Sequence, residues 1–431
     1  MQEQQFDVIV VGAGIAGCTA ATLFARRGLN VALVERNADC KAYKRMCTHF
    51  IQASAVPTIR RLGLDKAIET SGGIPNRIDF WTRWGWIRGE PHNDQGEPTH
   101  GYNIRRKTLD PLLRAMAANT PGVTFLAGYS AQELILDRRH VRGIKVQRAA
   151  GKAEFTASLL VGADGRNSRI ATLAGIVPRR SENCRGSYFA HYRNVSLAAD
   201  GRSQMWFADT DVGYSFPNDD GITVLACAVT KERMRAFKAD PAANLERFLT
   251  ALPDGPDLSS AERVTPVQQV LHYPNVSRPP VGDGLALVGD AAGSHDPLFG
   301  VGCGWAFQSA EWLVDAAADA LLRKKSVARA LKHYARTYHR HLAGHQFLVT
   351  DYSRRAHFNV IERLMYSAAA KDPHMAKHLL RFGARISGVS EFLSPTALMR
   401  AAWVNTTASR RYTTGPLTCT QFNEGNSHEY P

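Results

Sequence analysis

The stretch of sequence that decides the fold is FDVIVVGAGIAG, which spans Phe6 to Gly17. Its first half is short, apolar and rich in β-branched residues, and this predicts a buried parallel strand. Residues Cys18–Arg27 are rich in Ala and Leu and predict a helix, and Leu29–Val34 predicts a second strand. The glycines between the first strand and the helix therefore form the dinucleotide-binding fingerprint in the context that it requires.

Each part of this fingerprint has a physical role. Gly12 permits the tight turn, Gly14 lets a pyrophosphate approach the backbone, and Gly17 lets the helix pack closely on the strand. The helix N-terminus offers free N–H groups and the positive end of a dipole to phosphates. An acid at the end of the second strand accepts hydrogen bonds from ribose hydroxyls and disfavours a 2′-phosphate, so FAD or NAD fits better than NADP. The residues predicted to bind the cofactor here are Gly12, Ala13, Gly14, Ile15, Ala16, Gly17, Glu35 and Arg36.

The composition is that of an ordinary globular protein. The 431 residues suggest two or three domains, and 44% are hydrophobic while 21% are charged. No apolar run is long enough to span a bilayer and no signal peptide precedes the first strand, so a cytoplasmic protein is expected. The seven cysteines are scattered without a CxxC pair, which favours free thiols over a metal site or a disulfide framework.

The chain carries 53 Lys and Arg against 39 Asp and Glu, a net charge of +14. These basic residues are spread along the chain and form no long run, so a nucleic-acid partner is not expected. Part of the excess can instead attract an anionic cofactor or substrate. The oligomeric state is not readable from the sequence.

Two later strands end in an acid that lies beside glycine. Asp164 follows the apolar run Leu159–Val161, and Asp290 follows Leu285–Gly289. An acid at such a place is poorly solvated unless it is paired, and Asp290 is suited to accept a hydrogen bond from a ribityl hydroxyl. Several glycines then precede a helix predicted over Trp305–Leu322, which offers a second helix N-terminus for an anion.

The middle of the chain has a different pattern. Alternating strands at Tyr188–Val195, Gln204–Ala208 and Ile222–Val229 predict a second, mixed domain dominated by an antiparallel sheet. Aromatic residues in this region and in Ile74–Arg88 are expected mostly in the core, with some lining a substrate pocket. The candidates for substrate contact are Trp84, His191, Trp206, Tyr214, Phe216 and Pro297.

Three motifs together resemble the FAD-dependent monooxygenases of the aromatic-hydroxylase type (class A). The wider superfamily of these enzymes includes geranylgeranyl reductases and flavin-dependent halogenases. The first motif is the glycine fingerprint with Glu35. The second is GADGRNS at Gly162–Ser168, which is similar to the second FAD motif of these enzymes. The third is GDAA at Gly289–Ala292, followed by Pro297 and a Gly-x-Gly pair, which is similar to the third FAD motif of these enzymes. The order and spacing of the motifs match over roughly residues 5–330.

The resemblance implies an α/β fold. It has a Rossmann-like FAD domain with a parallel sheet, an α+β substrate domain with a mixed or antiparallel sheet, and a helical C-terminal region. The expected FAD domain comprises residues 1–73, 102–178 and 278–325, and the substrate domain residues 74–101 and 179–277. A helical region over 326–412 and a loose tail over 413–431 complete the expected organisation.

The resemblance also implies roles for single residues. Arg45 matches a basic residue that approaches the flavin, and Arg106 matches an arginine near the FAD diphosphate or ribityl chain. The strand leading to Tyr129 and Ala131 is where such enzymes contact adenine. His295 lies between Asp290 and the following glycines and, with Arg45, is a candidate catalytic residue. The other predicted cofactor contacts are Asp164, Gly165, Gly289, Asp290, Pro297, Gly300, Gly302, Cys303 and Gly304.

The reaction that the resemblance implies is a monooxygenation. NAD(P)H would reduce FAD while binding transiently, since the chain has no second GxGxxG unit. Oxygen would add at flavin C4a, and the hydroperoxide would transfer one oxygen atom to an apolar, aromatic or polycyclic small molecule, as in natural-product biosynthesis. The cofactor carries this chemistry, so no nucleophilic triad or metal is expected in the protein.

Departures from the pattern keep other activities open. Gly293 stands where the third motif usually has His, and the run that continues to Phe299 is closer to the reductase and halogenase branches. A flavin-dependent reductase or dehydrogenase is therefore the main alternative. Halogenation is less favoured, because Ile74–Trp84 lacks the expected lysine. A third possibility is a flavoprotein whose basic segment His333–Tyr366 docks to a membrane surface or a protein partner.

Overall fold

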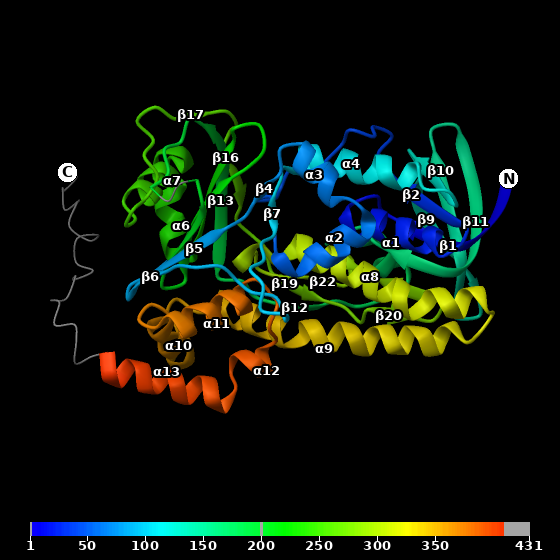
Figure 1. The fold of residues 1–431 in the computed structure, drawn as a ribbon. Coiled ribbons are helices and arrows are strands. Elements are labelled where there is room, and N and C mark those ends of the chain that lie inside the picture. The colour runs from blue at the N-terminus through cyan, green and yellow to red at the C-terminus, as the bar shows by residue number, and fades with distance from the viewer. Residues whose placement is uncertain (1, 199–200, 409–431) are drawn as a thin grey trace, which may run out of the picture.

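The computed structural model describes residues 2–198 and 201–408. Figure 1 shows a large sheet near the N-terminus, a second sheet at the other end of an elongated molecule, and long helices running beneath the first. Among the described residues, no helix combines the length and the apolar character that crossing a membrane requires.

The first sheet has a parallel core in the order β21, β11, β1, β2, β8. β20 pairs antiparallel with β21, and β9 and β10 form an antiparallel extension from β11. Helices α1 and α4 pack together, and α8 packs on α1. The bounds are β1 (Gln2–Val11), α1 (Ile15–Arg26), β2 (Val31–Glu35), α4 (Arg106–Ala118), β8 (Val123–Ala127), β9 (Ser130–Asp137), β10 (His140–Arg148), β11 (Gly151–Gly162), β20 (Val281–Gly282), β21 (Leu285–Leu287) and α8 (Val301–Leu322).

The register of this sheet confirms the predicted strand–turn–helix–strand unit. Val8 lies opposite Val31 on one side and opposite Leu159 on the other. None of the three side chains is exposed, because both faces of the parallel core are covered. The parallel strands bring their carboxyl ends to one edge of the sheet, which positions the three sequence motifs together.

The second sheet is mainly antiparallel, in the order β17, β13, β16, β15, β14, β5, β6, with β18 also paired to β13. Within it, β14 and β5 run parallel to each other. Helices α6 and α7 cover one face around a separate apolar cluster. The bounds are β5 (Ile78–Thr82), β6 (Gly85–Ile87), β13 (Arg185–Arg193), β14 (Ser203–Ala208), β15 (Asp211–Pro217), β16 (Thr223–Thr230), α6 (Lys231–Phe237), α7 (Pro241–Thr250), β17 (Glu262–Arg263) and β18 (Gln268–Val270).

Short elements form two small three-stranded sheets, β3-β7-β4 and β12-β19-β22, and several turns of helix. The bounds are β3 (Phe50–Ile51), η1 (Ala53–Ala55), α2 (Val56–Leu62), α3 (Asp65–Thr70), β4 (Ile74–Pro75), β7 (Tyr102–Asn103), α5 (Arg169–Leu173), β12 (Arg179–Ser181), β19 (Asn275–Ser277), η2 (Gly289–Ala291), β22 (Gly293–Ser294) and η3 (Leu298–Gly300).

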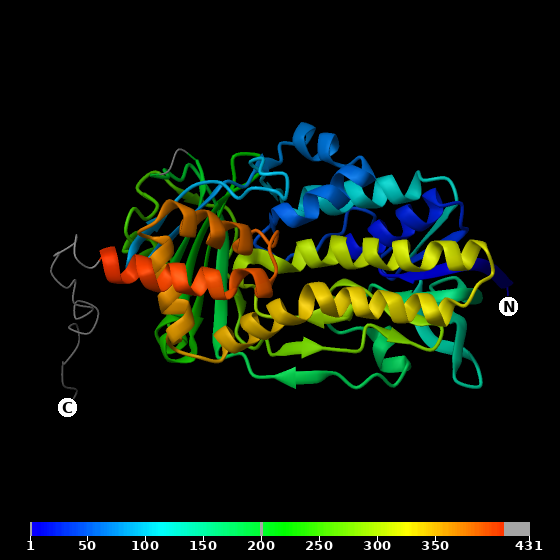
Figure 2. The same ribbon diagram turned by 60° about the horizontal axis from the view of Figure 1, so that its bottom comes forward.

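The C-terminal region is helical, as the sequence predicts. Figure 2 shows α9 beside α8, and α13 lying across the end of the molecule that holds the second sheet. Side-chain oxygens of Ser326, Asn359 and Asp372 cap the N-termini of α9, α10 and α11. The predicted tail over 413–431 lies outside the described residues. The bounds are α9 (Val327–Ser353), α10 (Val360–Ala369), α11 (Pro373–Gly383), α12 (Val389–Phe392) and α13 (Pro395–Ala408).

Candidate active site

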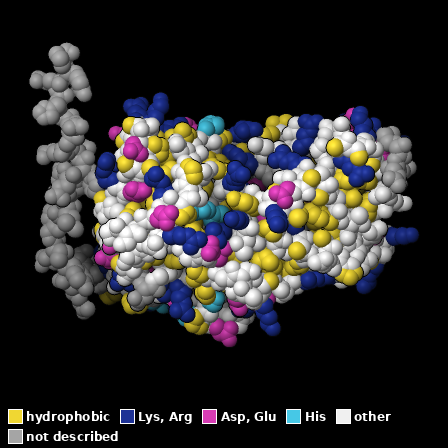
Figure 3. Space-filling view, turned by 90° about the horizontal axis from the view of Figure 1, so that it is seen from above, with side chains coloured by type: hydrophobic (Ala, Val, Ile, Leu, Met, Phe, Trp, Pro, Cys, Tyr) yellow, Lys and Arg dark blue, Asp and Glu magenta, His cyan; other side chains and the backbone are white. Residues whose placement is uncertain are grey.

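A cavity of about 720 Å³ joins the carboxyl edge of the first sheet to the second sheet. Four basic residues, Arg36, Lys44, Arg106 and Arg166, line it. In Figure 3, Lys and Arg side chains lie on several sides of a hollow near the middle of the upper face. The predicted site residues that line the cavity are Gly14, Ile15, Ala16, Arg36, Arg106, Asp164, Gly165, Tyr214, Asp290, His295, Pro297, Gly300, Gly302 and Cys303.

The turn between β1 and α1 is shaped to hold a dinucleotide. A Cβ atom at Gly12 would lie 2.5 Å from the Ala163 carbonyl oxygen, and one at Gly17 would lie 1.7 Å from the Gly12 carbonyl oxygen. A Cβ at Gly14 would meet nothing within 4 Å, so space is open above the middle of the turn. Glu35 Oε2 accepts the Ala13 N–H at 2.8 Å, which holds the carboxylate at the end of β2. This cradle fits the pyrophosphate and ribose of FAD.

Asp164 finds its partners in the following turn. Its Oδ1 accepts the Ser168 hydroxyl at 2.5 Å, and its Oδ2 accepts the Ile170 N–H at 3.0 Å. The carboxylate thereby satisfies donors at the start of the short helix α5 while still lining the cavity. The acid that the sequence marked as needing a partner is therefore paired within its own motif.

The third motif brings Asp290 against a residue that the sequence analysis did not identify. Lys44 Nζ donates to Asp290 Oδ2 at 2.8 Å, and this ion pair raises the pKa of Lys44 above its usual value. Lys44 lines the cavity, whereas the predicted Arg45 does not, although both residues are exposed. The role that the resemblance implies for Arg45 stays a prediction, and Lys44 is a second basic candidate at this end of the cavity.

Arg106 is almost completely buried, with 5% of its surface exposed. Its Nε donates to Asp110 Oδ1 at 2.5 Å, one turn along the same helix α4. Asp110 Oδ2 also accepts the backbone N–H of Lys44 at 3.0 Å, so the acid ties the Lys44 loop to α4. A buried, paired guanidinium at the cavity wall can position an anionic group of the cofactor.

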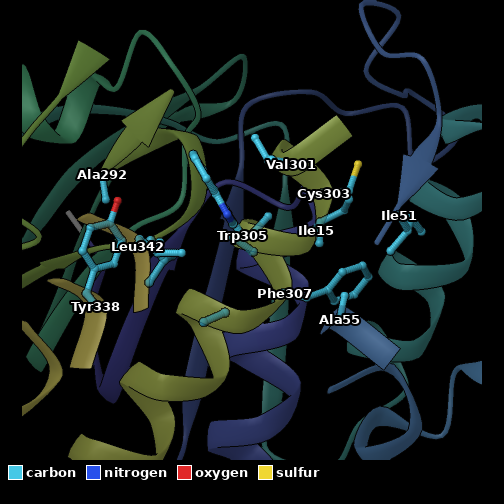
Figure 4. Packing of buried hydrophobic residues seen from close by; sticks show 14 of the residues in the cluster. Ile15, Ile51, Ala55, Ala292, Val301, Cys303, Trp305, Phe307, Tyr338 and Leu342 are labelled. Atoms are coloured by element: carbon cyan, nitrogen blue, oxygen red, sulfur yellow. The ribbon is translucent and has the colours of Figure 1, made fainter. Parts of the chain in front are cut away.

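Two cysteines that are far apart in the sequence meet in the cavity wall. The Sγ atoms of Cys47 and Cys303 are 4.0 Å apart. A hydrogen bond from the Cys303 thiol, with His49 and Arg106 nearby, holds the pKa of the Cys47 thiol well below its usual range. The same hydrogen bond and burial raise the pKa of Cys303. Figure 4 places Cys303 with Val301 and Trp305 at one end of α8.

His295 is the predicted catalytic histidine, and it lines the cavity with 6% of its surface exposed. Its Nε2 lies 3.0 Å from Ser277 Oγ, and its ring packs edge-on against Trp305 with centroids 5.6 Å apart. Burial lowers the pKa of His295 to about 4, so the imidazole is neutral at neutral pH. A neutral imidazole can accept or donate a proton within the site.

Asp296, which follows His295, anchors the loop before α8 to the second sheet. Arg185 of β13 makes a bidentate ion pair with Asp296, and both side chains are 1% exposed. Asp296 Oδ1 also accepts the Leu298 N–H at 3.0 Å, and Asn183 donates to Oδ2 at 2.8 Å. These bonds fix the segment that carries His295 and Pro297.

Several predicted contacts lie outside the cavity lining. Trp206 is fully buried and donates from Nε1 to the Pro253 carbonyl at 2.8 Å, and Phe216 packs on Phe50 at 4.9 Å. His191 contacts His49, and the Nε2 atoms of the two rings are 3.2 Å apart. The other predicted site residues that do not line the cavity are Gly12, Ala13, Gly17, Glu35, Arg45, Trp84, Tyr129, Ala131, Gly289 and Gly304.

The sequence analysis missed several lining residues. Arg166 stacks over the Tyr273 ring at 3.8 Å, and both side chains face the cavity with Trp305 and Phe189. Arg166 could have been identified from the sequence, because it is the basic residue of the second motif. The others carry no local pattern, since an aromatic residue in a strand or a helix is most often core.

Comparisons with known proteins identify the family of this chain. The chain belongs to the family defined by an FAD-binding domain, whose model matches residues 5–348. It is 29% identical over 347 residues to digeranylgeranylglycerophospholipid reductase 2 of Methanopyrus kandleri, covering 77% of this chain and 81% of that protein. The protein is thus an FAD-dependent oxidoreductase, and the predicted family and α/β fold are confirmed.

Solved structures share the fold at low sequence identity. The flavin-dependent brominase Bmp2 has a TM-score of 0.74 at 18% identity, covering 95% of this chain and 100% of that one. The probable FAD-dependent monooxygenase PqsL from Pseudomonas aeruginosa has a TM-score of 0.64 at 19% identity, covering 89% of this chain and 100% of that one. These similarities show that the chain shares the overall fold of the two proteins.

Proposed function

We propose that this protein is a monooxygenase that takes electrons from NAD(P)H and inserts one oxygen atom from O2 into an apolar, aromatic or polycyclic small molecule. The observation that carries the proposal is the continuous cavity that runs from the FAD motifs to the second sheet. The wall on the side of the second sheet is formed by Phe189, Tyr214 and Ala226, which suits a flat apolar substrate.

When bound, FAD supplies hydride acceptance and oxygen activation. The residues of the chain supply the surroundings. Arg106 and Lys44 offer positive charge to the diphosphate and ribityl region, and the first turn of α8 offers free N–H groups. The apolar wall excludes water from the substrate, and His295 is proposed to hold or move a proton beside it.

The test follows oxidation of NADPH and NADH by the purified holoprotein in air and under argon. Phenols and polyketides serve as trial substrates, and the products are analysed by mass. Oxygen-dependent turnover with a product heavier by one oxygen atom supports the proposal. Turnover that continues under argon, with a product changed only in hydrogen, contradicts it. A Glu35→Ala variant, which lacks the acid at the end of β2, is expected to retain less FAD and serves as the control for flavin dependence.

The role of His295 is tested in the same assay. His295→Ala is expected to slow product formation while FAD remains bound, because His295 bonds Ser277 and is not part of the dinucleotide cradle. Unchanged rates of both flavin reduction and product formation would remove His295 from the reaction.

A reductase is the second candidate. The observation that favours it is the 29% identity to a protein named as a digeranylgeranylglycerophospholipid reductase. Such an enzyme would transfer hydrogen to a carbon–carbon double bond without inserting oxygen. The assay under argon separates the two activities, because only the reductase gives a product heavier by two hydrogen atoms there.

A further inference from the structure

Two thiols lie side by side in the wall of the cavity. Cys47 and Cys303 are 256 positions apart in the sequence, yet their Sγ atoms are 4.0 Å apart. Cys47 is half-buried and Cys303 is 6% exposed, and both residues line the cavity. A disulfide requires a distance of about 2.05 Å between the two sulfurs, so they must approach each other by about 2 Å. A small local movement is therefore enough to join them.

The segment that carries Cys47 is built to allow this movement. Residues 36–49, between β2 and β3, contain no helix and no strand. Cys303, by contrast, lies in the first turn of the long helix α8, and Figure 4 shows its sulfur pointing away from Phe307 and Ala55. A loop can approach a fixed helix through changes in its own dihedral angles, so Cys47 can move toward Cys303 while α8 stays in place.

The surroundings give the two sulfurs different roles. The Cys47 sulfur accepts the backbone N–H of His49 at 3.2 Å. The hydrogen bond from the Cys303 thiol also holds the pKa of the Cys47 thiol well below its usual range, whereas the same bond and burial raise the pKa of Cys303. Cys47 is therefore the thiolate, which is the form that attacks an electrophile, and Cys303 keeps its proton.

The other cysteines of the described chain are placed differently. Burial raises the pKa of the Cys18 and Cys227 thiols, so both stay protonated. Cys40 is exposed and Cys184 is half-buried. Within residues 2–198 and 201–408, the contact in the cavity wall is the one that brings two cysteine sulfurs within hydrogen-bond distance. The pair thus combines a nucleophilic thiolate with a second thiol that can react with its oxidised form.

We propose that Cys47 and Cys303 form a redox-active dithiol, which hydrogen peroxide converts to a disulfide across the cavity wall. In the first step, the Cys47 thiolate attacks one oxygen atom of hydrogen peroxide. An S–O bond forms, the O–O bond breaks and hydroxide leaves, so the sulfur is oxidised to a sulfenic acid while the peroxide is reduced. The proton that the Cys47 thiol gave up converts this hydroxide to water.

In the second step, the Cys303 sulfur attacks the sulfur of the Cys47 sulfenic acid. The S–S bond forms, the S–O bond breaks, and the leaving hydroxide takes the Cys303 proton to give a second water. Two thiols and one hydrogen peroxide thus give one disulfide and two waters. The positive end of the α8 dipole favours the thiolate that Cys303 becomes in this step. Neither NAD(P)H nor an organic substrate takes part, so the reaction goes beyond the proposed monooxygenation.

The test uses the holoprotein after its thiols have been reduced and the reductant has been removed. Equimolar hydrogen peroxide is added at pH 7, the remaining thiols are blocked with N-ethylmaleimide, and the peptides are analysed by mass. We expect a linked pair of peptides that carry Cys47 and Cys303, lighter by two hydrogen atoms than the separate peptides. Dithiothreitol should separate them again.

The rate of oxidation provides a second measurement in the same samples. Only about 3% of a thiol with an ordinary pKa of about 8.5 is ionised at pH 7. The largely ionised Cys47 should therefore be consumed about tenfold faster than the exposed Cys40, after allowance for the lower nucleophilicity of a less basic thiolate.

Cys303→Ser isolates the first step, because a serine hydroxyl can donate a hydrogen bond to Cys47 but cannot form a disulfide. Peroxide should leave Cys47 of this variant as a sulfenic acid, which dimedone captures. Cys40→Ser is the matched control, since it removes an exposed thiol outside the pair, and it should keep the wild-type cross-link.

Three results with the wild-type protein would overturn the inference. One is that Cys47 and Cys303 both still react with N-ethylmaleimide after Cys40 has been oxidised. Another is that Cys47 forms its disulfide with a different cysteine, and the third is that Cys47 accumulates as a sulfinic acid without the cross-link. The wild-type result decides even where a variant fails to fold. Because the assay requires no turnover, failure of oxygen insertion would overturn the proposed monooxygenase and leave the dithiol intact.

Discussion

At the scale of single residues, burial changes the acid–base chemistry of His295. The pKa of His295 falls to about 4 in the folded protein, because the charged imidazolium would be buried, whereas an unfolded histidine has a pKa near about 6.5. Protonation between these two values therefore favours the unfolded chain. The contribution of neutral His295 to the free energy of unfolding is therefore fully present above about pH 6.5 and is lost as the pH falls toward 4.

Replacing this histidine should make the protein less sensitive to acid. Between pH 6.5 and 4.5, the free energy of unfolding of His295→Gln should fall less steeply than that of the wild-type protein, by up to about 1.4 kcal/mol per pH unit. Urea denaturation at several pH values measures both slopes. His191 and His345, whose pKa values burial also lowers, keep part of the slope in the variant. Identical slopes in the two proteins would contradict the prediction.

The thiol of Cys47 is expected to react readily, since its pKa is lowered by the hydrogen bond from Cys303. Alkylation with iodoacetamide, followed by mass analysis of peptides, should label Cys47 at neutral pH. Cys303→Ala removes the donor, so the rate of labelling at Cys47 should fall several-fold at pH 7. The exposed Cys40 provides the control within the same sample, and its rate should not depend on residue 303. An unchanged rate at Cys47 would show that the sulfur pair does not stabilise the thiolate.

At the scale of elements, the turn between β1 and α1 combines two different constraints. A side chain at Gly17 would overlap the Gly12 carbonyl, so Gly17→Ala should destabilise the packing of α1 by about 1–3 kcal/mol or more. Gly14→Ala meets no protein atom and should leave the free energy of unfolding of the apoprotein nearly unchanged. Its Cβ would instead occupy the space of the pyrophosphate, so FAD affinity should fall.

Thermal denaturation of the apoproteins and fluorescence titration with FAD separate these two effects. The two variants add the same methyl group three positions apart, so each is the control for the other. Equal loss of apoprotein stability in both variants would contradict the assignment of different roles to the two glycines.

The same elements show how far the sequence could predict the structure. The β1–α1–β2 unit was predictable because its strands, turn and helix all have local patterns in one short segment. The start of α8 was not, because Gly302 and Gly304 suggested a loop, whereas α8 begins at Val301. Lys44 and Trp305 were missed as cavity residues because only tertiary packing brings them there. The meeting of Cys47 with Cys303 depends on the arrangement of whole elements, which no local pattern encodes.

At the scale of the whole molecule, the cavity depends on how two sheets with separate covering helices are held against each other. The carboxyl edge of the parallel sheet supplies the cofactor motifs, and β13 and β15 supply the opposite wall. The Arg185–Asp296 pair spans this junction, with one residue on β13 and the other in the loop before α8. Tyr352 at the end of α9 stacks with the same guanidinium at 4.9 Å. Strands, loop and C-terminal helix thus converge on one buried charge pair.

Breaking this pair should destabilise the molecule and disturb the site together. Asp296→Ala leaves the Arg185 guanidinium buried without its carboxylate, which typically costs about 3–5 kcal/mol. It also frees the Leu298 N–H and Asn183, so the loop that carries His295 and Pro297 loses its anchors. Denaturant unfolding should show the loss of stability, and the KM for substrate should rise in protein that remains folded. Arg263→Ala breaks the exposed pair with Glu246 and should change stability by no more than about 1 kcal/mol. If Asp296→Ala lowered the free energy of unfolding no more than Arg263→Ala does, the buried pair would not be what holds the two sheets together across the cavity.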